Sequence, residues 1–229
     1  HPHIGTDRLR QIVKNIRLKI QHLGGEIHFN TTLTGISTDA KGLCAVQAGA
    51  LTLPCRQLVL ALGHSARDTF TMLHEAGIAM EAKDFAVGVR VEHPQRLIDQ
   101  NQYKEAAGHP RLKAAEYRLT CQTQEGRGVY SFCMCPGGYV VNASSEAERT
   151  CVNGMSYSDR EGKNANSAMI VTVTPEDYRP YHVEGTPDVL DGVAFQRALE
   201  HAAWEAGKGK VPVQLFGDFC ENRVSTALG

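Results

Sequence analysis

The spacing of hydrophobic residues near the start of the chain predicts an amphipathic helix. Apolar side chains recur every three or four residues, which places them on one helical face, at Leu9, Ile12, Val13, Ile16, Ile20 and Leu23. Thr6 or Asp7 can cap the start of this helix, and Gly24-Gly25 can end it in a left-handed turn. We therefore expect a helix from about residue 6 to residue 23.

The next segment changes to the shorter patterns of strands. Polar-flanked apolar runs predict strands at 26–29, 33–37, 44–48 and 50–53, with a turn at Asp39-Ala40-Lys41-Gly42. The run Leu58 to Leu62 is apolar at every position, which is typical of a central parallel strand covered on both faces. It stops at Gly63, where the absence of a side chain lets backbone approach a ligand.

The pattern changes again in the second part of the chain. We expect a helix at 66–76 that ends at Gly77, and a last helix at 194–206. Between them, strands separated by Gly-, Asn- and Ser-rich turns are predicted at 85–92, 117–121, 129–133, 139–142 and 168–173. This pattern of strands and turns indicates an antiparallel or mixed sheet. We place a domain boundary near residue 80, where the pattern changes.

Composition describes an ordinary globular protein. Hydrophobic residues make up 42% of the 229 residues and charged residues 21%, with a formal net charge of -1. No basic block favours nucleic acid, and no apolar run is long enough to cross a bilayer. The chain has no initiating Met and closes no pattern at its end, which indicates a segment of a longer protein. We expect a cytoplasmic location.

Cysteine and histidine usage argues against disulfides and metals. The seven cysteines are odd in number and scattered, so reduced thiols are the simpler interpretation. The chain has no CxxC pair, and its ten histidines show no ligand spacing of a zinc site. We therefore expect no metal.

Several strings in order along the chain resemble a family of largely uncharacterised bacterial FAD-dependent dehydrogenases. These strings are His3-Ile4-Gly5-Thr6-Asp7, Leu60-Ala61-Leu62-Gly63-His64-Ser65-Ala66-Arg67-Asp68-Thr69, Phe85-Ala86-Val87-Gly88-Val89-Arg90-Val91-Glu92-His93-Pro94, Tyr130-Ser131-Phe132-Cys133-Met134-Cys135-Pro136-Gly137-Gly138 and Asn164-Ala165-Asn166-Ser167-Ala168. They span residues 3 to 168, so the resemblance covers most of the chain. It implies FAD as cofactor, a small-molecule substrate, and NAD(P)H as a candidate electron donor.

The resemblance also implies which residues lie near the cofactor. Related flavoproteins offer backbone to the adenine at the turn that here is Thr32-Leu33, and the glycine that ends the later strand lies beside the cofactor. Leu33, Gly63 and His64 are therefore the implied FAD contacts; the alternative for Gly63 and His64 is a strand-to-helix turn without a ligand. Family members also carry a GxGxxG loop that holds the pyrophosphate, and this chain has none. We accordingly expect the isolated chain not to retain FAD.

Three residues are candidates for chemistry on the substrate side. Cys133 and Cys135 would share one face of a strand, where packing is the favoured interpretation and redox exchange the alternative. Pro136-Gly137-Gly138 predicts a turn whose N–H groups could face a ring or an anion. Arg90 could anchor a substrate carboxylate, or form an ion pair with Glu92 or another acid at a sheet edge. No acid/base pair stands out, so the catalytic residues stay unknown.

Two further strings have competing interpretations. Asn164 and Asn166 suit a pocket wall or an Asx turn, with the turn favoured. Gly217-Asp218 could be a strand-plus-Asp element for a flavin ribityl chain, but Pro212 in the preceding run favours a simple turn.

Together these observations predict an α/β chain. Residues 1–80 would form an incomplete Rossmann-like FAD-binding domain, and residues 81–229 a substrate-side α+β domain with a mixed or antiparallel sheet. The expected function is that of a fragment of a FAD-dependent oxidoreductase that works with the remaining segments of its parent chain. The alternative is a non-catalytic ligand-binding or interaction module of flavoprotein ancestry.

Overall fold

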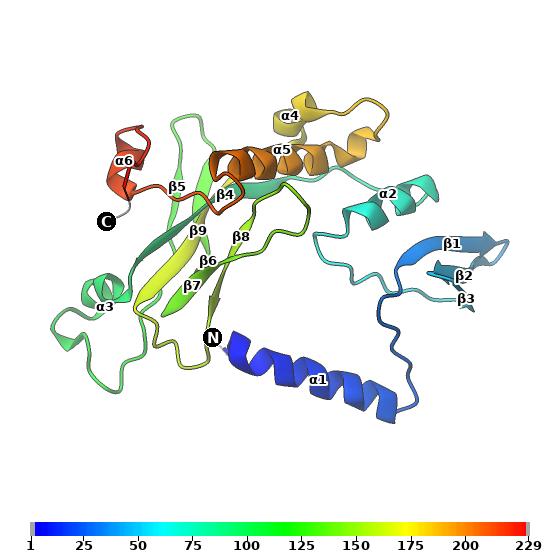
Figure 1. The fold of residues 1–229 in the computed structure, drawn as a ribbon, viewed down its shortest axis with the longest axis horizontal. Coiled ribbons are helices and arrows are strands. Elements are labelled where there is room, and N and C mark those ends of the chain that lie inside the picture. Colours follow the sequence, from blue (N-terminus) through cyan, green and yellow to red (C-terminus); the bar gives the residue numbers. More distant parts are fainter. Residues whose placement is uncertain (1–2, 228–229) are drawn as a thin grey trace.

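The computed structural model describes residues 3–227 and shows an α+β architecture with antiparallel sheets (Figure 1). Helix α1 (Thr6–His22) is followed by a three-stranded meander of β1 (Leu33–Asp39), β2 (Gly42–Ala48) and β3 (Leu51–Pro54). Helix α2 (Arg67–Glu75) packs against β1 and leads into the larger part of the chain. In Figure 1, α1 and the meander project away from that larger part.

A four-stranded antiparallel sheet forms the centre of the larger part. Its order is β4-β9-β6-β5, built from β4 (Phe85–Pro94), β9 (Asn164–Val173), β6 (Gly128–Cys135) and β5 (Thr120–Gln122). The longest pairing joins β4 and β9 in continuous register from Phe85 opposite Val173 to Pro94 opposite Asn164. A separate ribbon, β7 (Gly138–Asn142) with β8 (Val152–Ser156), packs against this sheet.

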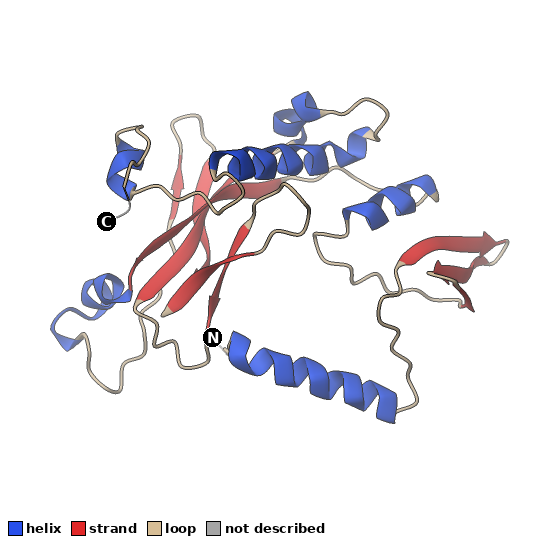
Figure 2. Cartoon of the chain, viewed as in Figure 1, coloured by secondary structure: helices blue, strands red, loops and turns tan. Residues whose placement is uncertain are grey.

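Helices cover the other face of the four-stranded sheet, as Figure 2 shows by colour. Phe195 of α5 (Asp191–Ala206) packs with Tyr178 of α4 (Pro175–Tyr178) and Val173 of β9, and Phe85 and Val87 of β4 join this cluster. The capping box between Thr174 and Asp177 fixes the start of α4. The remaining helices are α3 (Gln95–Tyr103), α6 (Phe216–Cys220) and the short 3₁₀ turns Lys104–Ala106, Arg179–Tyr181 and Asp188–Leu190.

The predicted elements are largely confirmed in the second part of the chain. The helices around 66–76 and 194–206 are present, and each of the five predicted strands overlaps an observed one. Strand β8 was missed because Asn153 and Gly154 interrupt its apolar pattern. Gly217-Asp218 lies within α6, and residues 211–215 form no strand, so both the favoured simple turn and the ribityl-binding alternative are wrong for this structure.

Two predicted strands in the first part are wrong. Residues 26–29 and 58–62 have no strand conformation and no ladder partner among the described residues. A central parallel strand needs neighbours on both edges, and residues 3–227 supply no parallel strand at all. The antiparallel α+β part of the predicted fold is thus present, whereas a Rossmann-like domain is not formed by the described residues.

The first helix follows its predicted bounds but not its predicted cap. Gly5 is the N-cap residue, at φ 82°, and no side chain caps the helix. No described helix is long and apolar enough to span a membrane.

Candidate functional site

Four of the strings that carry the resemblance meet at one end of the four-stranded sheet. At the start of α1, the Asp7 carboxylate accepts hydrogen bonds from the backbone N and the hydroxyl of Ser158, at 2.8 and 2.7 Å. The Thr6 hydroxyl donates to the carbonyl of Ser156 at the end of β8. The Ser158 hydroxyl bond lowers the pKa of Asp7. The side chains of Thr6 and Asp7 therefore hold α1 against the β7–β8 ribbon instead of capping the helix.

Buried Gln95 joins three of the loops around this end of the sheet. Its Oε1 accepts from the backbone N of Gly137 at 2.8 Å, while its Nε2 donates to the carbonyl of Ala115 and to Asp99. The carbonyl of Gly137 in turn accepts from the N of Gly162. The predicted turn at Pro136-Gly137-Gly138 is present, but the Gly137 N–H already has a partner within the chain. This N–H is thus not free to face a ring or an anion.

Arg90 lies on the face of the sheet that the β7–β8 ribbon covers. Its guanidinium donates to Oδ1 of Asn166, to the carbonyl of Cys133 at 3.1 Å and to the sulfur of Cys135 at 3.8 Å. A side chain on Gly154 of β8 would overlap this guanidinium, so glycine is required there for close approach. Among the described residues no carboxylate lies within ion-pair distance of Arg90, which leaves its charge balanced only by neutral acceptors.

This arrangement decides between some of the alternatives for Arg90 and the asparagines. The ion pair with Glu92 is wrong, because the Glu92 carboxylate accepts from Nδ2 of Asn164 at 2.6 Å instead. Asn164 and Asn166 both lie within β9, so the Asx turn is wrong as well. Asn166 is completely buried, and its Nδ2 has no hydrogen-bond partner among the described residues. Carboxylate anchoring by Arg90 stays a prediction.

Cys133 and Cys135 do not share a face. The register between β6 and β9 shifts between Phe132 and Cys135, and Cys133 adopts a left-handed conformation with φ 48°. The extra residue of this bulge turns Cys133 into solvent, while Cys135 keeps only 7% of its surface exposed. Burial, with the neighbouring Cys133, raises the pKa of the Cys135 thiol. Cys135 is therefore a poor thiolate nucleophile near neutral pH.

Sequence reasoning missed a polar pair on the opposite face of the same strands. The ring Nε2 of His93 lies 2.8 Å from the hydroxyl of Tyr117, and the Nδ1 of His93 is buried without a partner among the described residues. Burial raises the pKa of Tyr117, whose hydroxyl also bonds the side chain of Ser167. Tyr117 is thus a protonated hydroxyl that could act as a donor. The β4–β9 register places Ser167 beside Val91 and near His93, and the loop before β5 brings Tyr117 to them; the sequence spacing carries no signal of this arrangement.

The implied FAD contacts lie in the first part of the chain, away from these loops. Leu33 begins β1 opposite Ala48 and is half-buried, and His64 is exposed in the turn before α2. Gly63 has φ 72°, and a side chain built on it would meet no described atom within 4 Å. The open backbone at Gly63 fits the close approach of a ligand. No phosphate-binding glycine loop accompanies it, so the described residues do not fit a whole FAD molecule.

A buried charge network fixes the turn at Gly63 relative to the second part of the chain. Arg67, the first residue of α2, has 4% of its surface exposed and donates to both carboxylate oxygens of Glu200 in α5, at 2.7 and 3.0 Å. It also lies 3.3 Å from Glu146, to which Arg197 donates three further hydrogen bonds. Hydrogen bonding by Glu200 raises the pKa of Arg67. Sequence analysis included Arg67 in a family string without a role, since its partners are more than 75 residues away along the chain.

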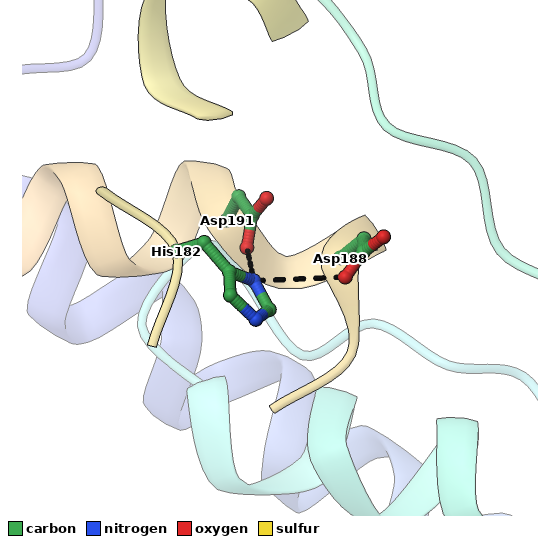
Figure 3. Close-up of side chains that lie close together, drawn as sticks. All are labelled: His182, Asp188 and Asp191. Atoms are coloured by element: carbon green, nitrogen blue, oxygen red, sulfur yellow. Dashed lines mark hydrogen bonds and ion pairs between the residues drawn. The ribbon is translucent and has the colours of Figure 1, made fainter. Parts of the chain in front are cut away.

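One side-chain cluster has the composition of a metal site. His182 Nδ1 lies 2.8 Å from Asp191 and 3.6 Å from Asp188 (Figure 3). Asp191 is buried, and His182 is its hydrogen-bond partner. Asp188 is 94% exposed. An ion pair that closes the loop before α5 explains this arrangement, so we assign no metal to it.

Comparison with known proteins gives the chain a family. Residues 84–229, more than half of the chain, match the family described as "FAD-dependent protein, C-terminal domain-like". An uncharacterised protein of Clostridium beijerinckii is 52% identical over 230 residues, which cover 99% of this chain and 42% of that protein. The chain thus spans less than half the length of this relative. The chain belongs to the family of FAD-dependent proteins that share this C-terminal domain.

Proposed function

We propose that this chain is a segment of a FAD-dependent oxidoreductase of the dehydrogenase type. In this proposal residues 81–229 supply the substrate-side wall, and residues 1–80 supply one edge of the flavin site. The match of residues 84–229 to a family of FAD-dependent proteins is the observation that carries it. A cytoplasmic location and a small-molecule substrate, with NAD(P)H as electron donor, belong to the same proposal.

The proposed contacts follow the open surfaces of the chain. Leu33, Gly63 and His64 would face FAD, because Gly63 leaves its backbone accessible next to an exposed His64. The remaining part of the FAD site would come from other segments of the parent protein. Among the candidates on the substrate side, geometry favours Arg90, since it has a charge without a carboxylate partner. It disfavours Cys135, which is buried with a raised pKa.

A non-catalytic interaction module of flavoprotein ancestry is the second candidate. It is supported by the lack of a fully formed flavin site and of an acid/base pair among the described residues. The two candidates differ in one measurable property. An oxidoreductase contains flavin in its full-length form, whereas the interaction module does not.

The test is the flavin content of the full-length protein that carries this chain. We expect a visible flavin spectrum that is released by heat. We also expect Gly63→Val to lower flavin affinity at least tenfold, about 1.4 kcal/mol, because a branched side chain would occupy the ligand's place. A colourless full-length protein would favour the interaction module.

Gly77→Val is the matched control for the Gly63 test. Gly77 follows α2 with φ 79° and, like Gly63 at φ 72°, has open space around its missing side chain. Both variants therefore introduce the same backbone strain. Equal flavin loss in the two variants, or loss at Gly63→Val that tracks its melting temperature, would contradict the cofactor contact.

The isolated chain gives a separate test of the incomplete site. Incubated with excess FAD and then desalted, it should retain no stoichiometric flavin absorbance, because it has no pyrophosphate loop. A stably yellow protein would show that the described residues suffice to bind FAD.

A further inference from the structure

Strand β4 forms a long open edge of the four-stranded sheet. It pairs with β9 over all 10 of its residues, from Phe85 to Pro94, in a register without a bulge. No described strand lies on its other side, because the order of the sheet is β4-β9-β6-β5. The opposite edge is formed by β5, whose 3 residues are too few to offer a long row of backbone groups. Of the two edges of this sheet, β4 is thus the one that can receive a further strand.

The hydrogen bonds at the end of β4 show which of its backbone groups face the open edge. The N–H of Gln95 donates to the carbonyl of Lys163 at 2.9 Å, one step beyond the pair of Pro94 and Asn164. In an antiparallel ladder, residues that bond their partner strand alternate with residues whose N–H and C=O point away from it. The outward residues of β4 with both groups are therefore Ala86, Gly88, Arg90 and Glu92. Their backbone groups have no hydrogen-bond partner among the described residues.

The side chains of this edge do not prevent another strand from pairing with it. Natural proteins protect edge strands with lysine, proline or a bulge, and residues 86–92 contain none of these. The two charged side chains, Arg90 and Glu92, bond Asn166 and Asn164 of β9 and are thus directed back over their own sheet. The edge therefore offers unpaired backbone without the usual protection.

A second copy of this chain fits the open edge because the edge is complementary to itself. When two β4 strands pair antiparallel about a two-fold axis at Val89, Ala86 lies opposite the partner's Glu92, and Gly88 lies opposite the partner's Arg90. Every outward N–H and C=O of these residues then has a partner. Val89, which is 58% exposed, lies directly opposite the partner's Val89 and is covered by it.

The neighbouring registers are less favourable. An axis one residue earlier places Asp84, just before β4, opposite the partner's Glu92, and an axis one residue later places Arg90 opposite the partner's Arg90. Like charges directly opposite each other destabilise a strand pair. An axis two residues later places Pro94, which has no N–H, opposite the partner's Gly88. The charges and hydrogen-bond donors of β4 thus favour the register in which all the outward groups are bonded.

We propose that β4 is a dimerisation edge, at which two copies of this chain join their four-stranded sheets into one continuous antiparallel sheet about a two-fold axis at Val89. The main-chain hydrogen bonds of the added strand hold the two copies together. Val87 lies opposite the partner's Val91 on the same face as Val89, so aliphatic side chains meet across the new pair. The dimer needs no flavin and leaves the guanidinium of Arg90 in its place under the β7–β8 ribbon.

Sedimentation equilibrium of the full-length protein that carries this chain tests the dimer. We expect the mass of two subunits, and we expect Val89→Lys to weaken dimerisation at least about tenfold, because two lysines would face each other at the axis. Val183→Lys is the matched control, since Val183 is 53% exposed and lies in a loop outside the sheet; it should leave the dimer unchanged. A monomeric unmodified protein, or equal effects of the two variants, would overturn the proposal.

A mixture of oppositely charged variants tests the position of the axis. Val89→Lys and Val89→Glu should each weaken the dimer when alone, because each places like charges opposite each other. Mixed together, they place a lysine opposite a glutamate and should form the heterodimer. Failure of the mixture to dimerise would overturn the pairing at Val89, since no other register brings these two positions together.

Amide hydrogen exchange distinguishes a second copy from another occupant of the edge. The outward amides of β4 should exchange at least about tenfold more slowly in the unmodified dimer than in the Val89→Lys monomer, because strand pairing protects them. This comparison is made on peptides that cover residues 85–94. Slow exchange in an unmodified protein that sediments as a monomer would mean that another segment of the longer protein occupies the edge, and would overturn the proposal.

Discussion

The two parts of this chain differ in how far their apolar side chains are buried and their polar side chains are hydrogen-bonded. In residues 84–227 the apolar residues form a core around Val173, Tyr178 and Phe195, and the polar residues form specific bonds such as those of Gln95. In residues 3–80, α1 has no buried residue and the apolar run 58–62 has no strand partner among the described residues. Both parts carry family strings, and the first also buries Val46, Ala48 and Leu73, but it leaves α1 and the run 58–62 without an apolar partner among the described residues.

This difference shows that a hydrophobic pattern specifies a requirement for burial but not the source of the partner. The pattern of α1 produces the expected helix, because i to i+4 bonds lie within the helix itself. The pattern of 58–62 produces no strand, because strand bonds need another strand. The two parts can therefore be compared by truncating side chains in each part and measuring the change in stability.

Core truncation should give the largest contrast between the parts. Phe195→Ala removes a ring that is 8% exposed and packs at 4.8 Å, centroid to centroid, on Tyr181. We expect the free energy of unfolding of the chain to fall by about 3–5 kcal/mol. Urea denaturation followed by circular dichroism measures this change.

Val13→Ala on α1 is the matching truncation in the first part. Val13 is 57% exposed, so its loss should change stability by no more than about 0.5 kcal/mol in the isolated chain. A loss comparable to that of Phe195→Ala would mean that α1 is packed in solution and would remove the contrast between the parts.

Breaking the charge network between α2 and α5 should have the next largest effect. Arg67→Ala leaves Glu200 and Glu146 partly buried without their shared cation. Removing one partner of a buried ion pair costs about 3–5 kcal/mol, and we expect the lower end because both carboxylates keep some solvent contact. Arg197→Ala is the control; its side chain is 43% exposed, so about 1 kcal/mol or less is expected.

Glu146 of this network, together with the separate Arg127–Asp177 ion pair, predicts a decline of stability in acid. Arg197, aided by Arg67, lowers the pKa of Glu146 from its ordinary value of 4.5, and Arg127 lowers that of Asp177 from 3.8. A depressed folded-state pKa contributes stability that is present above the unfolded pKa and is lost as pH falls through the folded one. The urea midpoint should therefore fall steadily below about pH 4.5.

Arg197→Met offers a way to assign part of that pH dependence. Without the hydrogen bonds of Arg197, its main donor, the pKa of Glu146 should return toward its ordinary value, so the slope of stability against pH below 4.5 should become shallower. An unchanged slope would indicate that Glu146 does not contribute to acid unfolding.

The part of the fold that could be predicted from sequence was the part governed by local rules. Helix α1 followed from its apolar spacing and Gly24-Gly25, and α5 from the face that carries Phe195. Strand β8 could not be found because Gly154 serves close packing on Arg90, a contact that only the tertiary structure creates. Residues 58–62 followed the strand pattern, but the pattern could not reveal that no described strand pairs with them.

The candidate site was less predictable, because strand register and contacts distant in sequence determine which of its residues lie together. A single bulge after Phe132 separated Cys133 from Cys135, and no residue in the string signals it. Arg67 and Glu200, whose hydrogen bonds hold α2 against α5 next to the turn at Gly63, are 133 residues apart in sequence. Leu33, Gly63 and His64 stay predictions until flavin content is measured.

The smallest expected effect concerns Cys133, and it tests the bulge directly. Cys133→Ser should change stability by no more than about 0.5 kcal/mol, because the side chain lies in solvent. In the native chain Cys133 should react rapidly with a thiol reagent, whereas Cys135 should react slowly, since it is buried and its pKa is raised. Mass spectrometry of the labelled peptides distinguishes the two thiols.

Thiol counting under denaturing, non-reducing conditions should then find all seven cysteines reduced. A stable disulfide between Cys133 and Cys135 would contradict the outward position of Cys133 and would favour redox exchange at this bulge.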